Sequence, residues 1–202
     1  MKITVLGASG GTGRAIVELA REAGHEVTAI VRTANGRDTV ADVMDPDSLG
    51  PHVAGADAVV SAVGSRSPRN PTSVQTDSTE SLLVAMAAHD VRRLVVVSNS
   101  GMVTDGDDPF SRYAVKPILR RVLRHPWADM ARMEEVVRAS GLEWTILRPP
   151  RLTDGPRTDT FRTAVDTNVR GGITVSRADL ASLVLRCLVD PGTAGKAISL
   201  AN

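Results

Sequence analysis

Short apolar runs alternate along this chain with stretches of helical period, and this alternation limits its possible folds more than any other feature. The runs are rich in Val and Ile and carry few charges, as strands buried on both faces do. They are Ile3–Leu6, Val27–Val31, Thr39–Val40, Ala58–Val63, Arg93–Val97 and Glu143–Leu147. The helical stretches between them are Thr12–Ala23, Asp47–Ala54, Ser73–Ala88 and Met130–Ala139. The alternation predicts stacked βαβ units in an α/β domain with a mostly parallel sheet and helices on both faces.

The pattern loosens after Pro149. Ser176-Arg177-Ala178-Asp179 has the spacing of a capping box that opens a helix to Val189, and Ala197–Leu200 follows as a final strand. With 202 residues, we expect one domain over 1–202, with 103–128 and 149–176 as insertions on the substrate side. Two loop-like stretches, 64–72 and 103–110, follow strands at the sheet edge where open α/β folds bind ligands.

Composition excludes several classes of protein. The net charge is only +1 and aromatic residues make up 2% of the chain, so neither a basic surface nor stacking platforms for nucleic acid are expected. A single cysteine, Cys187, rules out an internal disulfide, and no Cys/His pair has metal-ligand spacing. The first apolar run is too short for a signal peptide or a membrane span. We expect a cytoplasmic protein with no metal, no membrane contact and no nucleic-acid partner.

A glycine-rich turn lies directly between the first strand and the first helix. Its glycines at 7, 10 and 13 have G-x-x-G-x-x-G spacing, which in this context allows a sharp turn, a close approach to a pyrophosphate and tight helix packing. The helix N-terminus then faces the anion. The residues predicted to hold the phosphates are Gly7, Ser9, Gly10, Gly11, Thr12 and Gly13. We predict a doubly wound Rossmann fold that binds a dinucleotide; the alternative is a tight βα turn without a ligand.

The end of the second strand decides which dinucleotide fits. It carries Arg32 where an acidic residue would bind a free ribose 2′-hydroxyl, and a guanidinium suits a 2′-phosphate. NADP is therefore expected in preference to NAD, with Arg37 assisting; the alternative is that Arg32 is a solvated loop arginine. The rest of this wall of the groove is predicted to be Asp42, Val43, Ala62, Val63 and Gly64.

With these residues in view, nearly the whole chain resembles the atypical short-chain dehydrogenase/reductases, in the branch of NmrA-like proteins and biliverdin reductase B (flavin reductase). The matching pieces are the glycine turn 7–13, the strand 26–32, Ser140-Gly141-Leu142-Glu143-Trp144-Thr145-Ile146-Leu147-Arg148-Pro149-Pro150 and Ser176-Arg177-Ala178-Asp179-Leu180-Ala181. The resemblance implies NAD(P)H binding and, for the nearest relatives, hydride transfer to flavins or tetrapyrroles.

The catalytic residues depart from the superfamily pattern. Many members use a Tyr and a Lys four residues later, but alignment places Trp127 and Ala131 there. Tyr113 and Lys116 are three residues apart and are interpreted as a chance pairing. Arg151 stands where the biliverdin and flavin branch has a histidine, and it could stabilise negative charge on a reduced ring.

The family's serine position falls within Ser98-Asn99-Ser100, so these side chains are candidates to bind the nicotinamide amide or an acceptor carbonyl. Ordinary capping of the strand end is the alternative. Ser98 and Pro149 are also expected beside the cofactor. The candidate catalytic residues are therefore the three of this segment, Ser98, Asn99 and Ser100, together with Arg151.

Two other features have simple structural interpretations. Lys116, Arg120 and Arg124 form a basic stripe opposite an apolar face of Val115, Ile118, Leu119 and Val122. This predicts an amphipathic surface helix with its polar face in water, or else a basic rim that attracts an anionic acceptor such as FMN. Cys187 shares a face with leucines and is expected to be buried and inert.

An acceptor that needs no strong protein acid suits a site without the Tyr/Lys pair. We therefore expect an NADPH-dependent reductase of a flavin, a quinone or a related conjugated acceptor, with this small molecule as its partner, acting as a monomer or small homo-oligomer. The alternative is a non-catalytic NADP(H)-sensing regulator of the NmrA-like kind. An epimerase or dehydratase that holds NAD is disfavoured by Arg32 and by the missing pair.

Overall fold

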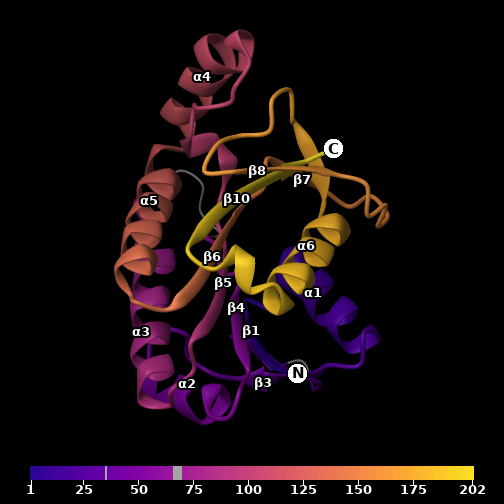
Figure 1. Cartoon of the computed structure of the whole chain (residues 1–202). Helices are drawn as coiled ribbons and strands as arrows, with labels where there is room; N and C mark the ends of the chain where they lie inside the picture. The colour runs from indigo at the N-terminus through magenta and orange to yellow at the C-terminus, as the bar shows by residue number, and fades with distance from the viewer. Residues whose placement is uncertain (35, 66–69) are drawn as a thin grey trace.

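A computed structural model describes residues 1–34, 36–65 and 70–202 and shows an eight-stranded sheet between two layers of helices (Figure 1). The strand order is β3-β2-β1-β4-β5-β6-β10-β8, with parallel pairing up to β10 and an antiparallel β8 at the edge. The strands of this sheet are β1 (Lys2–Leu6), β2 (Glu26–Val31), β3 (Thr39–Val40), β4 (Ala58–Ser61), β5 (Arg93–Val97), β6 (Glu143–Arg148), β8 (Arg162–Val165) and β10 (Lys196–Ala201). A separate parallel pair joins β7 (Arg151–Thr153) to β9 (Thr174–Ser176).

Helices cover both faces of the sheet, as the doubly wound fold requires. Helices α1 (Gly11–Glu22) and α6 (Arg177–Val189) pack against one face, with Ile16, Leu180 and Val184 in the shared core. Helices α2 (Pro46–Val53), α3 (Val74–Ala88) and α5 (Arg124–Ala139) cover the other (Figure 1). The single-domain Rossmann architecture predicted from the sequence is confirmed.

The predicted strands and helices of the repeating part are present, and two of their boundaries differ from the prediction by more than one residue. Helix α5 begins at Arg124 rather than near Met130, because Pro126 falls in its first turn, where a proline is tolerated. Strand β4 ends at Ser61 rather than Val63. Just beyond this end, the carbonyl oxygen of Ala62 lies 2.6 Å from the place of a Cβ atom on Gly7.

The segment after Pro149 contains structure that periodicity did not predict. Strands β7, β8 and β9 are each three or four residues long, too short to show a pattern. The predicted cap of the next helix is present, since the hydroxyl of Ser176 accepts a hydrogen bond from the backbone N–H of Asp179 at 2.9 Å.

The predicted amphipathic surface helix is wrong in its orientation. Helix α4 (Lys116–Val122), preceded by a π-helical turn (Ser111–Val115), projects from the sheet (Figure 1). Lys116 is only 9% exposed, whereas Ile118 is 68% exposed. The amine of Lys116 can be buried because it lies 2.6 Å from the Asp107 carboxylate and donates to the carbonyls of Ser100 and Val103. Within the described part of the chain, no helix is long and apolar enough to cross a bilayer.

Candidate functional site

The parallel register brings the ends of the central strands to one edge of the sheet. Leu6 is aligned with Ile30 and Ser61, Ser61 with Val96, and Val97 with Leu147. The residues that follow these strands therefore gather along this edge. They are the glycine turn from Gly7, Arg32, Ala62–Gly64, Ser98–Ser100 and Pro149. Strand order reverses between β1 and β4, and open α/β sheets bind ligands at that point.

The glycine-rich turn has the geometry of a cradle. Gly7 has a positive φ of +76°, and a Cβ atom there would lie 2.6 Å from the carbonyl oxygen of Ala62. A Cβ atom on Gly13 would collide with the carbonyl oxygen of Gly7. Gly10 caps α1 with no side chain, so the first N–H groups of this helix remain available. The turn therefore fits a phosphate group at the positive end of α1. Ser9 and Thr12 belong to the same turn, and Ser9 is exposed.

Arg32 lies just beyond β2 and is exposed. Its guanidinium has no hydrogen-bond or ion-pair partner among the residues that the structure describes. Asp42 is exposed and its carboxylate accepts a hydrogen bond from the N–H of Met44 at 2.9 Å, while Val43 packs against the core. Along this edge, the exposed guanidinium of Arg32 thus lies beside the glycine turn, and the loop at Asp42 is fixed by a local hydrogen bond.

The segment after β4 lies beside the glycine turn. The N–H of Ala62 donates to the carbonyl of Leu6 at 3.0 Å, and the carbonyl of Val63 accepts a hydrogen bond from the Gln75 amide at 3.4 Å. Gln75, a buried residue of α3, was not anticipated from the sequence. Gly64 is exposed. Of the loop predicted over 64–72, residues 66–69 lie outside the described part of the chain.

Ser98 is held in a buried network. Its hydroxyl donates to the carboxylate of Glu134 on α5 at 2.6 Å, and Arg148 at the end of β6 donates to both oxygens of the same carboxylate. All three residues are less than 10% exposed. The network joins β5, α5 and β6 at the sheet edge. Neither Glu134 nor Arg148 was singled out from the sequence, because a buried ion pair between distant elements leaves no periodic signal.

The side chain of Asn99 forms the cap that was the alternative interpretation of this segment. Its Oδ1 accepts from the N–H of Gly101 at 2.6 Å and caps the 3-10 turn Ser100–Met102. The N–H of Ser100 donates to the carbonyl of Pro149 at 3.0 Å. Segment 98–100 is therefore fixed from both sides, and Pro149 is buried against it.

The Tyr/Lys pair of the superfamily is absent in space as well as in sequence. Trp127 is buried beside Gly101, where it would contact any added Cβ atom. Tyr113 is 74% exposed, and the amine of Lys116 is bound to Asp107, so these two residues do not form a catalytic pair. Arg151, at the start of β7, is exposed, and its side chain has no polar partner among the described residues.

Arg177 was treated as part of a helix cap, but its side chain reaches the glycine turn. A Cβ atom on Gly11 would lie 2.9 Å from Nε of Arg177. The guanidinium also forms an ion pair with Asp154. This contact joins α6 to α1 at the sheet edge. Sequence spacing could not predict it, because the two residues are more than 160 positions apart.

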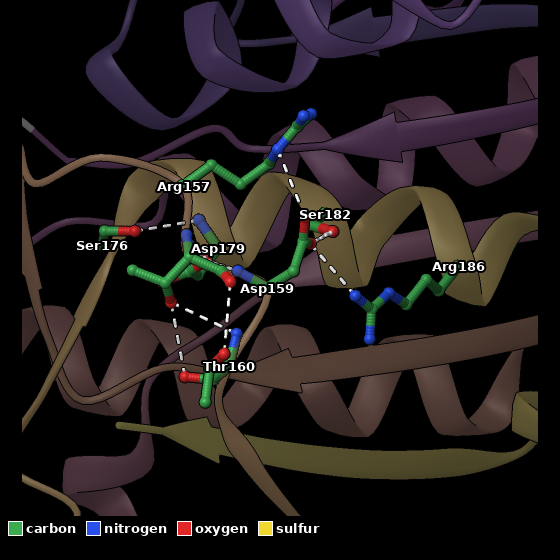
Figure 2. A network of polar contacts seen from close by, with 8 residues as sticks. Arg157, Asp159, Thr160, Ser176, Asp179, Ser182 and Arg186 are labelled. Atoms are coloured by element: carbon green, nitrogen blue, oxygen red, sulfur yellow. Dashed lines mark hydrogen bonds and ion pairs between the residues drawn. The ribbon is translucent and has the colours of Figure 1, made fainter.

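A polar network fixes the loop that begins at Asp154 (Figure 2). The carboxylate of Asp179 accepts from the N–H groups of Thr158 and Asp159 at 2.7 and 2.8 Å and from the hydroxyl of Thr158 at 2.9 Å. Burial raises the pKa of Asp179, but these hydrogen bonds outweigh it and hold the pKa below its usual value. Asp159 in turn accepts from Ser182 and Arg186 of α6.

The chemistry of other candidate groups is limited by their surroundings. Burial raises the pKa of the Cys187 thiol to about 11, in agreement with the inert role expected for it. Among residues 1–34, 36–65 and 70–202, no group of three or more His, Cys, Asp or Glu side chains is arranged to hold a metal ion.

A family model described as NAD(P)H-binding matches residues 7–191, which include the cradle and the edge residues described above. The chain belongs to this NAD(P)H-binding family. The family resemblance inferred from the sequence is confirmed at this level.

Individual relatives match over almost the full length. The uncharacterised protein YwnB of Bacillus subtilis is 28% identical over 201 residues, which are 95% of this chain and 93% of YwnB. The uncharacterised sugar epimerase YhfK of the same organism is 28% identical over 99% of this chain and 94% of YhfK. A Streptococcus pneumoniae structure named provisionally as an NADH-flavin reductase is 29% identical, with a TM-score of 0.77 over 100% of this chain and 99% of that one.

Proposed function

We propose that this protein is an NADPH-dependent oxidoreductase that transfers hydride to a flavin, a quinone or a related conjugated acceptor. The glycine cradle and the uncapped N-terminus of α1 suit the pyrophosphate of a dinucleotide. Arg32 carries the cofactor preference, because it offers an unpartnered guanidinium at the end of β2, where a ribose 2′-phosphate would lie.

The residues at the carboxyl edge suit positioning rather than proton transfer. Bound NADPH would supply the hydride. The buried Ser98–Glu134–Arg148 network and the cap made by Asn99 hold the end of β5 rigid beside it. Trp127 stands where the superfamily's tyrosine would donate a proton. An acceptor protonated by water after hydride transfer fits such a site.

Arg151 is the group best suited to meet the acceptor. Its exposed side chain, free of polar partners among the described residues, lies on β7 directly after Pro149-Pro150. A guanidinium there would favour negative charge that develops on a reduced ring. Segments 103–128 and 149–176, which include α4 and β7 to β9, would form the walls of the acceptor pocket.

Turnover tests the proposal directly. The purified protein would be mixed with NADPH and, in turn, FMN, FAD, riboflavin, menadione and biliverdin, with NADH in parallel, and loss of the reduced nicotinamide absorbance would be followed. Oxidation of NADPH above background with any acceptor supports a reductase. NADPH binding by calorimetry without turnover would favour the NADP(H)-sensing alternative, and absence of binding would contradict both.

A further inference from the structure

The position of Arg177 is unusual for a cation. It is the first residue of α6, yet its side chain lies over Gly11, the first residue of α1, with Nε 2.9 Å and Cδ 3.1 Å from the place of a Gly11 Cβ atom. A Cβ atom at position 11 would therefore push the Arg177 side chain aside. The guanidinium consequently lies at the N-terminus of α1.

A helix N-terminus carries a partial positive charge, so a guanidinium there is unfavourable unless an anion is shared. No side chain caps α1 at Gly10. The anion that meets Arg177 is the carboxylate of Asp154. The Asp154 side chain is 90% exposed and that of Arg177 is 29% exposed. The N-terminus of α1 and the Arg177 guanidinium thus lie together as two positive groups. The solvent-exposed carboxylate of Asp154 is paired with the guanidinium only.

The sheet register holds this ion pair in place. Thr153 and Ser176 are paired in the β7–β9 ladder, so the residues that follow them, Asp154 and Arg177, leave the ladder side by side. The loop after Asp154 is tied to α6 by the Asp179 network (Figure 2). The fold therefore holds the backbone of Asp154 beside that of Arg177, within reach of the ion pair.

We propose that Arg177 binds the pyrophosphate of the dinucleotide beside the N-terminus of α1, and that Asp154 occupies the guanidinium in the free protein. Cofactor binding then exchanges one anion on Arg177 for another. This inference rests on the proposed function, because it requires a dinucleotide in the glycine cradle. Arg177 is then a cofactor-binding residue, and the Asp154 carboxylate competes with the pyrophosphate for its guanidinium.

The two residues have opposite expected effects on affinity. Loss of Arg177 removes a charge-assisted contact to the pyrophosphate, which NADPH and NADH share, so both should bind more weakly. Loss of the Asp154 charge frees the guanidinium, so both should bind more tightly. This pattern differs from that expected for Arg32, which concerns the 2′-phosphate of NADPH alone.

The test is calorimetric titration of the full-length protein with NADPH and with NADH. Arg177→Ala should raise both dissociation constants about tenfold to a hundredfold, as for hydrogen bonds to charged groups. Arg177→Lys should fall between Arg177→Ala and the wild type. Asp154→Asn should lower both constants by about two- to fivefold, in keeping with an exposed ion pair. Arg92→Ala is the matched control, since Arg92 is an exposed, ion-paired arginine directly before β5, at the opposite edge.

The outcomes separate the inference from the proposed function. If folded Arg177→Ala binds both dinucleotides like the wild type, the inference is wrong and the proposed function stands. If Arg177→Ala does not fold, Asp154→Asn decides, because unchanged or weaker binding by this exposed, conservative variant overturns the inference. If the wild-type protein binds neither dinucleotide, the proposed function is wrong and the inference falls with it.

Discussion

Arg32 and Arg177 lie at the same sheet edge but differ in what surrounds them. Arg32 is exposed and has no partner in the described part of the chain, whereas Arg177 is paired with Asp154 and lies over Gly11. The guanidinium of Arg32, at the end of β2, can bind the ribose 2′-phosphate, which only NADPH has. The guanidinium of Arg177, beside the glycine cradle, can bind the pyrophosphate, which NADPH and NADH share. Surroundings rather than residue type therefore separate their expected roles.

Arg32→Ala should weaken NADPH binding by about tenfold to a hundredfold, because charge-assisted hydrogen bonds to a phosphate contribute about 1.5–3 kcal/mol. NADH binding should change by less than about twofold, since NADH lacks the 2′-phosphate. Calorimetry with both dinucleotides measures the two effects in one variant. Equal loss for NADPH and NADH would contradict the role given to Arg32.

Asp179→Asn should destabilise the fold by about 1–3 kcal/mol, because it weakens the hydrogen bonds that hold residues 158 and 159 to α6. The folded pKa of Asp179 lies below its usual 3.8. The ionised carboxylate thus stabilises the fold above about pH 4, and this contribution is lost as the pH falls through the folded pKa. Urea unfolding at several pH values should show a gap to the wild type that is constant near neutrality and shrinks in acid.

Asp77→Asn is the control for this measurement, because Asp77 is exposed and, among the described residues, is bonded only to Ser73. It should change the free energy of unfolding by less than about 0.5 kcal/mol. A gap for Asp179→Asn that widens in acid would contradict the sign argued here.

At the scale of elements, α4 departs most from the sequence interpretation. Its lysine is buried and its apolar residues Ile118 and Val122 are exposed. The amine of Lys116, the carboxylate of Asp107 and the amide of Asn168 form a group that holds the segment after β5. Helical periodicity predicts which residues share a face, but it does not say which face another segment will meet.

Lys116→Met should cost about 3 kcal/mol, because it leaves the Asp107 carboxylate largely buried without its cation. Combining it with Asp107→Asn should cost less than the sum of the single changes, since neither charge then remains unpaired. Thermal or urea unfolding of the single and double variants measures the coupling. Arg120→Met, the same charge loss at an exposed site of α4, should change stability by less than about 0.5 kcal/mol. Strict additivity would show that the pair is solvated.

For the whole molecule, cofactor binding and folding are linked through the sheet edge. The cradle, the ends of β2 and β5 and the start of α6 come from distant parts of the chain and meet only in the folded state. A dinucleotide that binds this edge therefore binds the native state and not the unfolded chain.

NADPH at about one hundred times its dissociation constant should stabilise the protein by about 2.7 kcal/mol. For a domain of this size, the midpoint of thermal unfolding should then rise by about 5–11 °C. Differential scanning calorimetry with NADPH, NADH and adenosine measures the effect, and at equal concentrations NADPH should give the largest shift. A larger shift with NADH would contradict the cofactor preference proposed here.

From the amino-acid sequence we could predict the alternating architecture, the glycine turn at its switch point and the candidate residues that follow the central strands. These features are local, because strand and helix periods, Gly7 and Gly13, and the cap at Ser176 depend on neighbouring residues. The contacts between distant charges could not be predicted in this way and are seen only in the folded chain. Ser98 and Arg148 both donate to Glu134, Lys116 is buried against Asp107, and Arg177 lies over Gly11. Such pairs follow from how the elements pack, and no spacing along a single element encodes them.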